Sequence, residues 1–299
     1  MEKIEINDHS NIKKRGPVSA ILGNFDGFHI GHQELCLKAS IEAKNPTAII
    51  FFDKDYDCFL DEESEHLCSL DDKILFAEKL HIDNAFILKT SNEFYSMSAE
   101  EFINLLKNIG VKEIFVGTDF KFGANRSGDN SLLAQHFDVH IVKDVLDKNH
   151  KKVSSTNIKK LIKNGKIGEA CINLGRLYEI KGEAIEGLHN GEKIGIKTIN
   201  LSLSENYVLP KDGVYFGITY VNGIPYKSLI NVGRNPTVGV LDKPQIESHL
   251  LDFPDTQLYG KTIYVQFIKF IREEQKFASL IDLKKQIEAD IAEISKEIL

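Results

Sequence analysis

Residues 23–32 read Gly23-Asn24-Phe25-Asp26-Gly27-Phe28-His29-Ile30-Gly31-His32, directly after the apolar run Val18–Leu22. An apolar run, a glycine-rich turn and a helical start are typical of a strand that passes through a tight turn into a helix. The glycines let the chain turn sharply and let a ligand approach the backbone closely. Unpaired N–H groups at a helix N-terminus bind anions, and two histidines three residues apart face the same ligand on a first helical turn. The stretch therefore predicts a binding site for a nucleoside triphosphate.

Strand and helix patterns alternate along the first part of the chain. Apolar runs at Val18–Leu22, 47–52, 85–88, 114–117 and 139–142 predict strands. Between them, Ser98 with Glu101 three residues later is a capping box, apolar residues follow at helical spacing, and Gly110 suits the position after the helix end. This alternation predicts a parallel sheet covered on both faces. Ligands of such sheets lie beyond the carboxyl ends of the strands, where the glycine turn and Asp119 both fall.

The pattern changes near Gly182, where short strands with turn signals replace the helices. The expected strands are 214–220, 227–232, 245–251 and 262–270, and Asn222-Gly223 between the first two is a strong hairpin signal. Such a run predicts a small antiparallel barrel. A final helix with an apolar stripe, capped by Ser279, is expected to pack against it. The stripe consists of Leu280, Leu283, Ile287, Ile291, Ile294 and Ile298.

Composition narrows the class of protein. A length of 299 residues favours two domains, and 42% hydrophobic with 27% charged residues is ordinary for a globular protein. The net charge of −7 argues against a nucleic-acid partner, because such binding relies on attraction to phosphate. No apolar stretch reaches membrane-spanning length, and residues 1–5 lack the apolar core of a signal peptide, so we expect a cytoplasmic protein with no membrane partner. The four cysteines lack metal-site spacing and are expected to be free thiols.

Three later segments follow the opening stretch. They are Val116-Gly117-Thr118-Asp119-Phe120-Lys121-Phe122-Gly123 with Arg126 and Gly128-Asp129 behind it, then Ser154-Ser155-Thr156-Asn157-Ile158-Lys159, and Leu174-Gly175-Arg176-Leu177-Tyr178. Alone, the aspartate would be a turn residue and the serines a helix cap. In this order, the segments resemble the HxGH nucleotidylyltransferase superfamily, in the GxFDGxHxGH form of bacterial FAD synthetases.

The resemblance implies a Rossmann-like α/β domain that transfers the AMP moiety of ATP to FMN and releases pyrophosphate. It assigns His29 and His32 to the ATP phosphates as catalytic residues. The other nucleotide-binding residues that it implies are Gly23, Asn24, Phe25, Asp26, Gly27, Gly31, Asp119, Ser154, Ser155, Thr156 and Lys159. Such chemistry needs aligned phosphates and neutralised charge more than covalent help from the protein, which suits these donors.

The second part carries its own ordered motifs. They are Gly182–Asn200, Asn231–Thr237, Glu247–Phe253, Leu258–Gly260 and Phe270–Phe277. In this order they resemble riboflavin kinase, the barrel domain fused behind the adenylyltransferase in bacterial bifunctional enzymes. The resemblance implies that Glu247 is the catalytic base that takes the proton of the riboflavin 5′-hydroxyl. It places Gly187, Gly191, Lys193 and Gly195 in a nucleotide-binding loop, and Thr198 and Asn200 at Mg²⁺ and the ATP phosphates.

The predicted domains are therefore residues 1–181, FMN adenylyltransferase-like, and residues 182–299, riboflavin kinase-like. Riboflavin, FMN and ATP are the expected substrates, Mg²⁺ is the expected metal, and the oligomeric state is left open.

Several alternatives remain at this point. Lys197 and Glu192 stand where riboflavin kinases have proline and arginine, which would suit a weakened or inactive kinase. The stretch Asp53–Tyr56 and Asn157 also depart from the family pattern, which would suit a flavin-binding regulatory protein without catalysis. A different phosphate ester as acceptor is compatible with the HxGH core, and a metal site on the two histidines lacks an evident third ligand.

Overall fold

The computed structural model describes residues 1–7, 16–54, 61, 63–185, 198–233, 245–254, 258–294 and 296. The chain divides into two compact units, Met1–Ser155 and Thr156–Leu299. Within the described residues, no helix combines the length and the apolar character that crossing a membrane requires.

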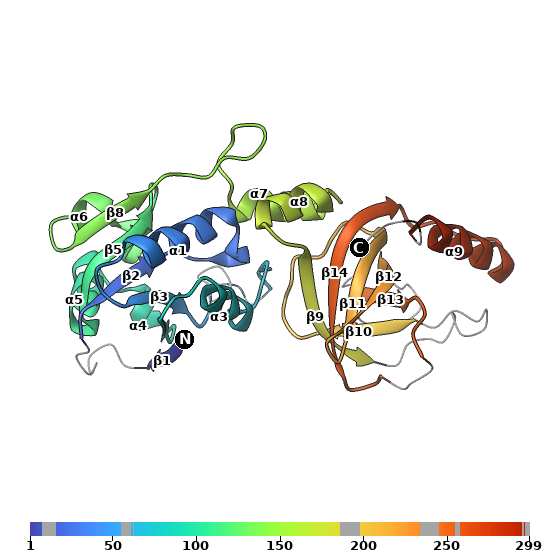
Figure 1. Cartoon of the computed structure of the whole chain (residues 1–299), viewed down its shortest axis with the longest axis horizontal. Coiled ribbons are helices and arrows are strands. Elements are labelled where there is room, and N and C mark those ends of the chain that lie inside the picture. The colour runs from blue at the N-terminus through green and yellow to red at the C-terminus, as the bar shows by residue number, and fades with distance from the viewer. Residues whose placement is uncertain are drawn as a thin grey trace. The chain divides into compact units, whose positions relative to one another are not determined.

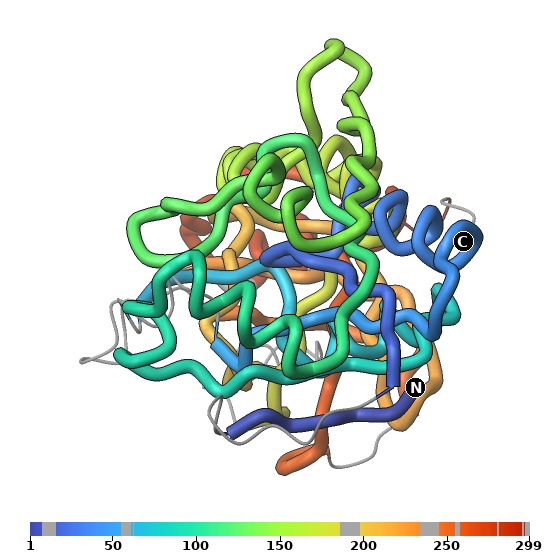
Figure 2. Tube along the Cα trace, turned by 90° about the vertical axis from the view of Figure 1, so that its left-hand side faces the viewer, coloured from blue at the N-terminus to red at the C-terminus, as the bar shows by residue number. Residues whose placement is uncertain are grey.

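The first unit is built on a six-stranded sheet in the order β1-β4-β3-β2-β5-β8, and all neighbouring strands run parallel (Figure 1). The strands are β1 (Glu2–Ile6), β2 (Val18–Leu22), β3 (Thr47–Phe52), β4 (Asn84–Leu88), β5 (Val111–Gly117) and β8 (Asp138–Val142). The predicted parallel sheet is therefore confirmed. Strand β1, in dark blue at one edge in Figure 2, is an addition that the sequence pattern did not predict.

Helices cover both faces of this sheet. They are α1 (Ile30–Glu42), α3 (Leu70–Lys79), α4 (Asn92–Tyr95), α5 (Ala99–Ile109) and α6 (Asn130–Leu133), with the short helices η1 (Asp26–Phe28) and η2 (Ala124–Arg126) and the small hairpin of β6 (Lys121–Phe122) and β7 (Gly128–Asp129). Ala20 of β2 packs into the core cluster that contains α5, and the next residue, Ile21, packs into the cluster that contains α1 and α3. Successive side chains of this buried strand thus point to opposite faces of the sheet and pack into two separate hydrophobic cores.

Helix α5 forms where its end signals predicted it. Ser98 and Glu101 make the reciprocal hydrogen bonds of a capping box, and Gly110 takes a left-handed conformation, with φ of 103°, after the last turn.

The second unit is a closed six-stranded barrel in the order β10-β13-β12-β11-β14-β9. Its strands are β9 (Tyr178–Ile185), β10 (Ile199–Leu203), β11 (Gly213–Val221), β12 (Ile224–Gly233), β13 (Gln245–Leu250) and β14 (Thr262–Arg272), and all pairs are antiparallel. Asn222 and Gly223 form the predicted two-residue turn, with φ of 51° and 79°. The antiparallel barrel is confirmed.

The described part of the second unit also contains the helices α7 (Ser155–Lys163), which starts at the unit boundary, α8 (Ile167–Leu174) and α9 (Leu280–Ile294). Helix α9 begins after Ser279, whose hydroxyl accepts the N–H of Asp282 at 3.2 Å. Ile294 of α9 shares a buried hydrophobic cluster with Phe216 of β11, and Ile287 packs against this cluster, which confirms the expected contact between the helix and the barrel. The predicted domain division between residues 181 and 182 falls within β9.

Candidate functional site

The turn after β2 positions the first candidate site. Strand β2 ends at Leu22, and α1 begins at Ile30. Phe25 and Phe28 take left-handed backbone conformations, with φ of 56° and 40°, and their rings are fully buried in the core. A Cβ at Gly23 would lie 3.1 Å from the Phe25 ring, so glycine gives this ring its room. The turn is therefore anchored by two buried aromatic rings.

The two histidines of the turn lie together. The imidazole rings of His29 and His32 stack with their centroids 3.7 Å apart and their planes 15° apart. His29 is the N-cap residue of α1 and is 6% exposed. A Cβ at Gly31 would lie 3.2 Å from the His29 ring. Two imidazoles at the positive end of a helix dipole offer N–H donors where a phosphate is already attracted.

The other polar residues of the turn shape its backbone. Ser155 Oγ donates to the carbonyl of Asp26 at 2.8 Å, which joins the serine segment to the turn. The Asp26 carboxylate is buried and accepts the N–H of Leu67 at 2.8 Å. The Nζ atom of Lys73, a buried residue of α3, donates to the carbonyl of Asn24 at 3.4 Å. The sequence pattern did not predict that Leu67 and Lys73 hydrogen-bond to this turn.

Asp119 lies just after β5, which is hydrogen-bonded to β2 in the sheet. One carboxylate oxygen of Asp119 lies 2.7 Å from Nζ of Lys152, and the same Nζ lies 2.9 Å from Asp144. The hydrogen bond from Lys152 lowers the pKa of Asp119, so this carboxylate is charged at neutral pH. Asp119 thus occupies the predicted edge of the sheet, but with a cationic partner that the sequence pattern did not reveal.

Thr156 and Lys159 follow on α7 within the second unit, where Thr156 is exposed and Lys159 is partly buried. Their predicted contacts with a nucleotide, and that of Ser154 in the first unit, stay predictions.

The second candidate site lies on three neighbouring strands of the barrel. Glu247 of β13 is in register with Asn200 of β10 on one side and with Asn231 of β12 on the other. Directly paired residues of antiparallel strands point to the same face, so these side chains are neighbours. Burial, and next the nearby carboxylate of Glu274, raise the pKa of Glu247 above its usual range. A carboxylate with a raised pKa is suited to accept a proton.

The sequence pattern assigned no role to Asn231, nor to a further residue of this group, Glu274. Its carboxylate accepts a hydrogen bond from the amide of Asn231 at 3.2 Å. The sequence feature that could have identified Glu274 is its position within the motif Phe270–Phe277. Thr198 lies just before β10, and its predicted contact with Mg²⁺ and the ATP phosphates stays a prediction. The loop residues Gly187, Gly191, Lys193 and Gly195, together with Glu192 and Lys197, lie outside the described residues.

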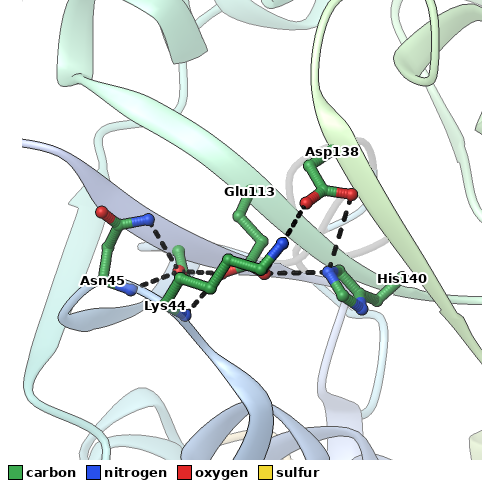
Figure 3. Close-up of polar contacts among 6 residues, drawn as sticks. Lys44, Asn45, Glu113, Asp138 and His140 are labelled. Atoms are coloured by element: carbon green, nitrogen blue, oxygen red, sulfur yellow. Dashed lines mark hydrogen bonds and ion pairs between the residues drawn. The ribbon is translucent and has the colours of Figure 1, made fainter.

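A cluster of side chains of the types that bind metals lies outside both candidate sites, near the amino ends of β5 and β8. Among the residues that the structure describes, ligand atoms of Glu113, Asp138 and His140 come within 4.8 Å of one another. Figure 3 shows what balances them: Nζ of Lys44 lies 2.7 Å from Asp138 and 4.0 Å from Glu113. The Glu113 carboxylate also accepts from the hydroxyl of Ser19 at 2.5 Å. The lysine supplies the positive charge here, so we interpret the cluster as a link between β2, β5 and β8.

Comparisons with known families match both units. A family model described as FAD synthetase matches residues 11–157, and one described as riboflavin kinase matches residues 174–298.

Individual relatives cover nearly the whole chain. The bifunctional riboflavin kinase/FMN adenylyltransferase of Buchnera aphidicola subsp. Schizaphis graminum (strain Sg) is 36% identical over 301 residues, which cover 96% of each chain. The protein of the same name from Bacillus subtilis (strain 168) is 33% identical over 295 residues, covering 94% of this chain and 93% of its own. The crystal structure of a macrolide-efflux protein from Streptococcus pneumoniae is similar with a TM-score of 0.89 and 28% identity, covering 100% of both chains.

Proposed function

Because this chain belongs to the family of bifunctional riboflavin kinase/FMN adenylyltransferases, we propose that the unit with the barrel phosphorylates riboflavin and that the unit with the parallel sheet converts the FMN to FAD. ATP is the co-substrate of both reactions. The observation that carries the division is that the two candidate centres lie in different compact units. The stacked His29 and His32 lie in the first unit, and Glu247 with its asparagine neighbours lies in the second.

In adenylyl transfer, an oxygen of the FMN phosphate attacks the α-phosphorus of ATP, and the bond to the β-phosphate breaks to release pyrophosphate. The protein must align the two phosphates and offset the charge that builds on the leaving group. His29 and His32 supply imidazole donors for this charge, and the first N–H groups of α1 add the helix-terminal contribution. The burial of Phe25 and Phe28 keeps these donors in place, which avoids the cost of ordering them when substrate binds.

In riboflavin phosphorylation, the 5′-hydroxyl oxygen attacks the γ-phosphorus of ATP, and ADP leaves. Glu247 accepts the hydroxyl proton, a role that its raised pKa favours. Asn200, which is in register with Glu247, and Thr198, two residues earlier, carry the hard oxygen ligands that Mg²⁺ prefers, and they would hold it jointly with ATP phosphates. A bound Mg²⁺ would withdraw charge from the phosphate oxygens.

To test this proposal, the purified protein is incubated with riboflavin, excess ATP and Mg²⁺. The flavins are separated by chromatography at successive times. FMN first and FAD later is the expected sequence of products. His29→Ala should abolish FAD formation and spare FMN formation, and Glu247→Gln should do the reverse when FMN is supplied for the second reaction. His136→Ala and Glu288→Gln, which change exposed residues, are the matched controls and should leave both rates unchanged.

Each alternative predicts a different product pattern. Equal loss of both activities in either variant would contradict two separate centres. FAD formed only from added FMN would indicate an inactive kinase, and binding of flavin without any turnover would indicate a regulatory protein.

A further inference from the structure

The segment between β8 and Ser154 forms a small hairpin, visible in Figures 1 and 2 as the light green loop that projects before α7. Leu146 and Lys152 pair as an antiparallel bridge. At the tip, the Asp147 carboxylate accepts the N–H groups of Asn149 and Lys151 at 2.8 and 2.9 Å. This tight turn returns the chain, so that Lys152 lies close to the start of the hairpin.

The returned Lys152 connects the hairpin with the turn after β5. Its Nζ lies 2.7 Å from Asp119 and 2.9 Å from Asp144. The hydroxyl of Thr118 donates to the same oxygen of Asp144 at 2.8 Å. Two adjacent residues of the turn are thus held by two residues of the hairpin. The whole group lies at the carboxyl edge of the sheet, one strand away from the histidine turn.

The charge of Asp119 would conflict with a nucleotide at this edge. A carboxylate repels a triphosphate, and it is charged at neutral pH here because the hydrogen bond from Lys152 lowers its pKa. Asp119 and Asp144 together carry a charge of −2, and the positive charge of Lys152 reduces the net charge of the group to −1. It also holds the Asp119 carboxylate toward the hairpin, although the Asp119 side chain is 74% exposed.

We propose that Lys152 is a positioning residue of adenylyl transfer, whose ammonium orients the Asp119 carboxylate and offsets its charge so that ATP can approach the turn after β5. The inference rests on the adenylyltransferase site proposed above. Lys152 acts through Asp119 and need not touch the nucleotide itself.

A double-mutant cycle in the full chain tests this role. Lys152→Gln should raise the KM for ATP in FAD formation by about fivefold to tenfold, with a smaller change in kcat. In the background of Asp119→Asn, the same substitution should change this KM by less than about twofold, because no charge is left to offset. Lys152→Arg should keep the KM close to that of the unchanged protein.

Two controls separate this effect from a general loss of structure. Lys44→Gln removes another lysine–aspartate pair of the same unit, at the opposite edge of the sheet, and should leave the KM for ATP unchanged. FMN formation should be unchanged in every variant. A KM that does not respond to Lys152→Gln would overturn the proposal. So would an equal increase in the Asp119→Asn background, because Lys152 would then act on the nucleotide directly. If His29→Ala retained FAD formation, the proposed site itself would fail, whatever the result at Lys152.

Discussion

At the scale of single residues, the position of the His29 ring depends on an absent side chain. Gly31 lies in the first turn of α1, where an alanine would ordinarily favour the helix by about 1 kcal/mol. A Cβ there would approach two atoms of the His29 ring to 3.2 Å, which is closer than comfortable contact. Helix stability and ring position therefore make opposite demands on this residue.

Gly31→Ala should leave the melting temperature unchanged or higher, but lower the rate of FAD formation by tenfold or more, because small displacements of a reacting group are costly. FMN formation should not change. Gly168→Ala on α8 is the matched control, since nothing lies within 4 Å of its Cβ position. Unchanged FAD formation in Gly31→Ala would show that the space over Gly31 does not set the position of the His29 ring.

At the scale of elements, the cluster around Glu113 links three strands of the sheet. Burial by itself would raise the pKa of Glu113, but the hydrogen bonds from Ser19 and from the backbone of Lys44, with His140 nearby, bring this pKa below its ordinary value. A carboxyl whose pKa is lower in the folded state stabilises the fold above its unfolded pKa, about 4.3 for glutamate. This contribution is lost as the pH falls through the folded-state pKa.

Glu113→Gln should therefore lower the free energy of unfolding by about 1–3 kcal/mol at pH 7, and the difference from the unchanged protein should shrink below about pH 4. Urea unfolding at a series of pH values measures both effects. Glu42→Gln, which breaks an exposed pair with Lys38, is the control and should leave the free energy of unfolding nearly unchanged. A difference that persists at acidic pH would contradict the assigned role of the carboxylate.

The same elements show which features the sequence could predict. The central strands were predictable because fully buried parallel strands are continuous apolar runs, as in Val18–Leu22. Strand β5 begins three residues earlier than its apolar run indicated, because Glu113 is buried through partners on other strands. Strand β1 alternates charged and apolar residues, and its partner β4 lies far along the chain. Periodicity carries no information about such distant partners.

The first candidate site likewise has features that the sequence could predict and features that it could not. The histidine pair was predictable only in part, because His32 lies in the first turn of α1, whereas His29 is the N-cap residue with an extended backbone, and helical spacing does not set the place of its ring. The part of Lys152 was not, because a lysine is ordinarily a solvated surface residue, and only the hairpin brings it to Asp119.

At the scale of the whole molecule, each compact unit has its own core. Ile114 lies fully buried in the sheet of the first unit, and Ile230 lies fully buried in the barrel. Removing three carbons from such a side chain costs about 2–5 kcal/mol. A substitution that destabilises the core of one unit should therefore reduce the activity of that unit before the activity of the other.

Ile114→Ala should make FAD formation more sensitive to heating and leave the heat sensitivity of FMN formation unchanged, while Ile230→Ala should do the opposite. The measurement is the residual rate of each reaction after incubation across a range of temperatures. Parallel loss of both activities in either variant would mean that the two units unfold as one.

The pairing of β9 with β14 also sets an order in time during synthesis. The sheet of the first unit has all its strands once Val142 has left the ribosome, but the barrel lacks its closing strand until Arg272 has followed. The 87 residues that follow Ile185, up to and including Arg272, take about 4–17 s at the usual rate of translation. Throughout that interval β9 lacks its β14 partner, and β11 lacks the same partner from its own synthesis onward. Chaperone binding should therefore peak in nascent chains of this length, and premature termination there leaves strand edges that can pair with other chains.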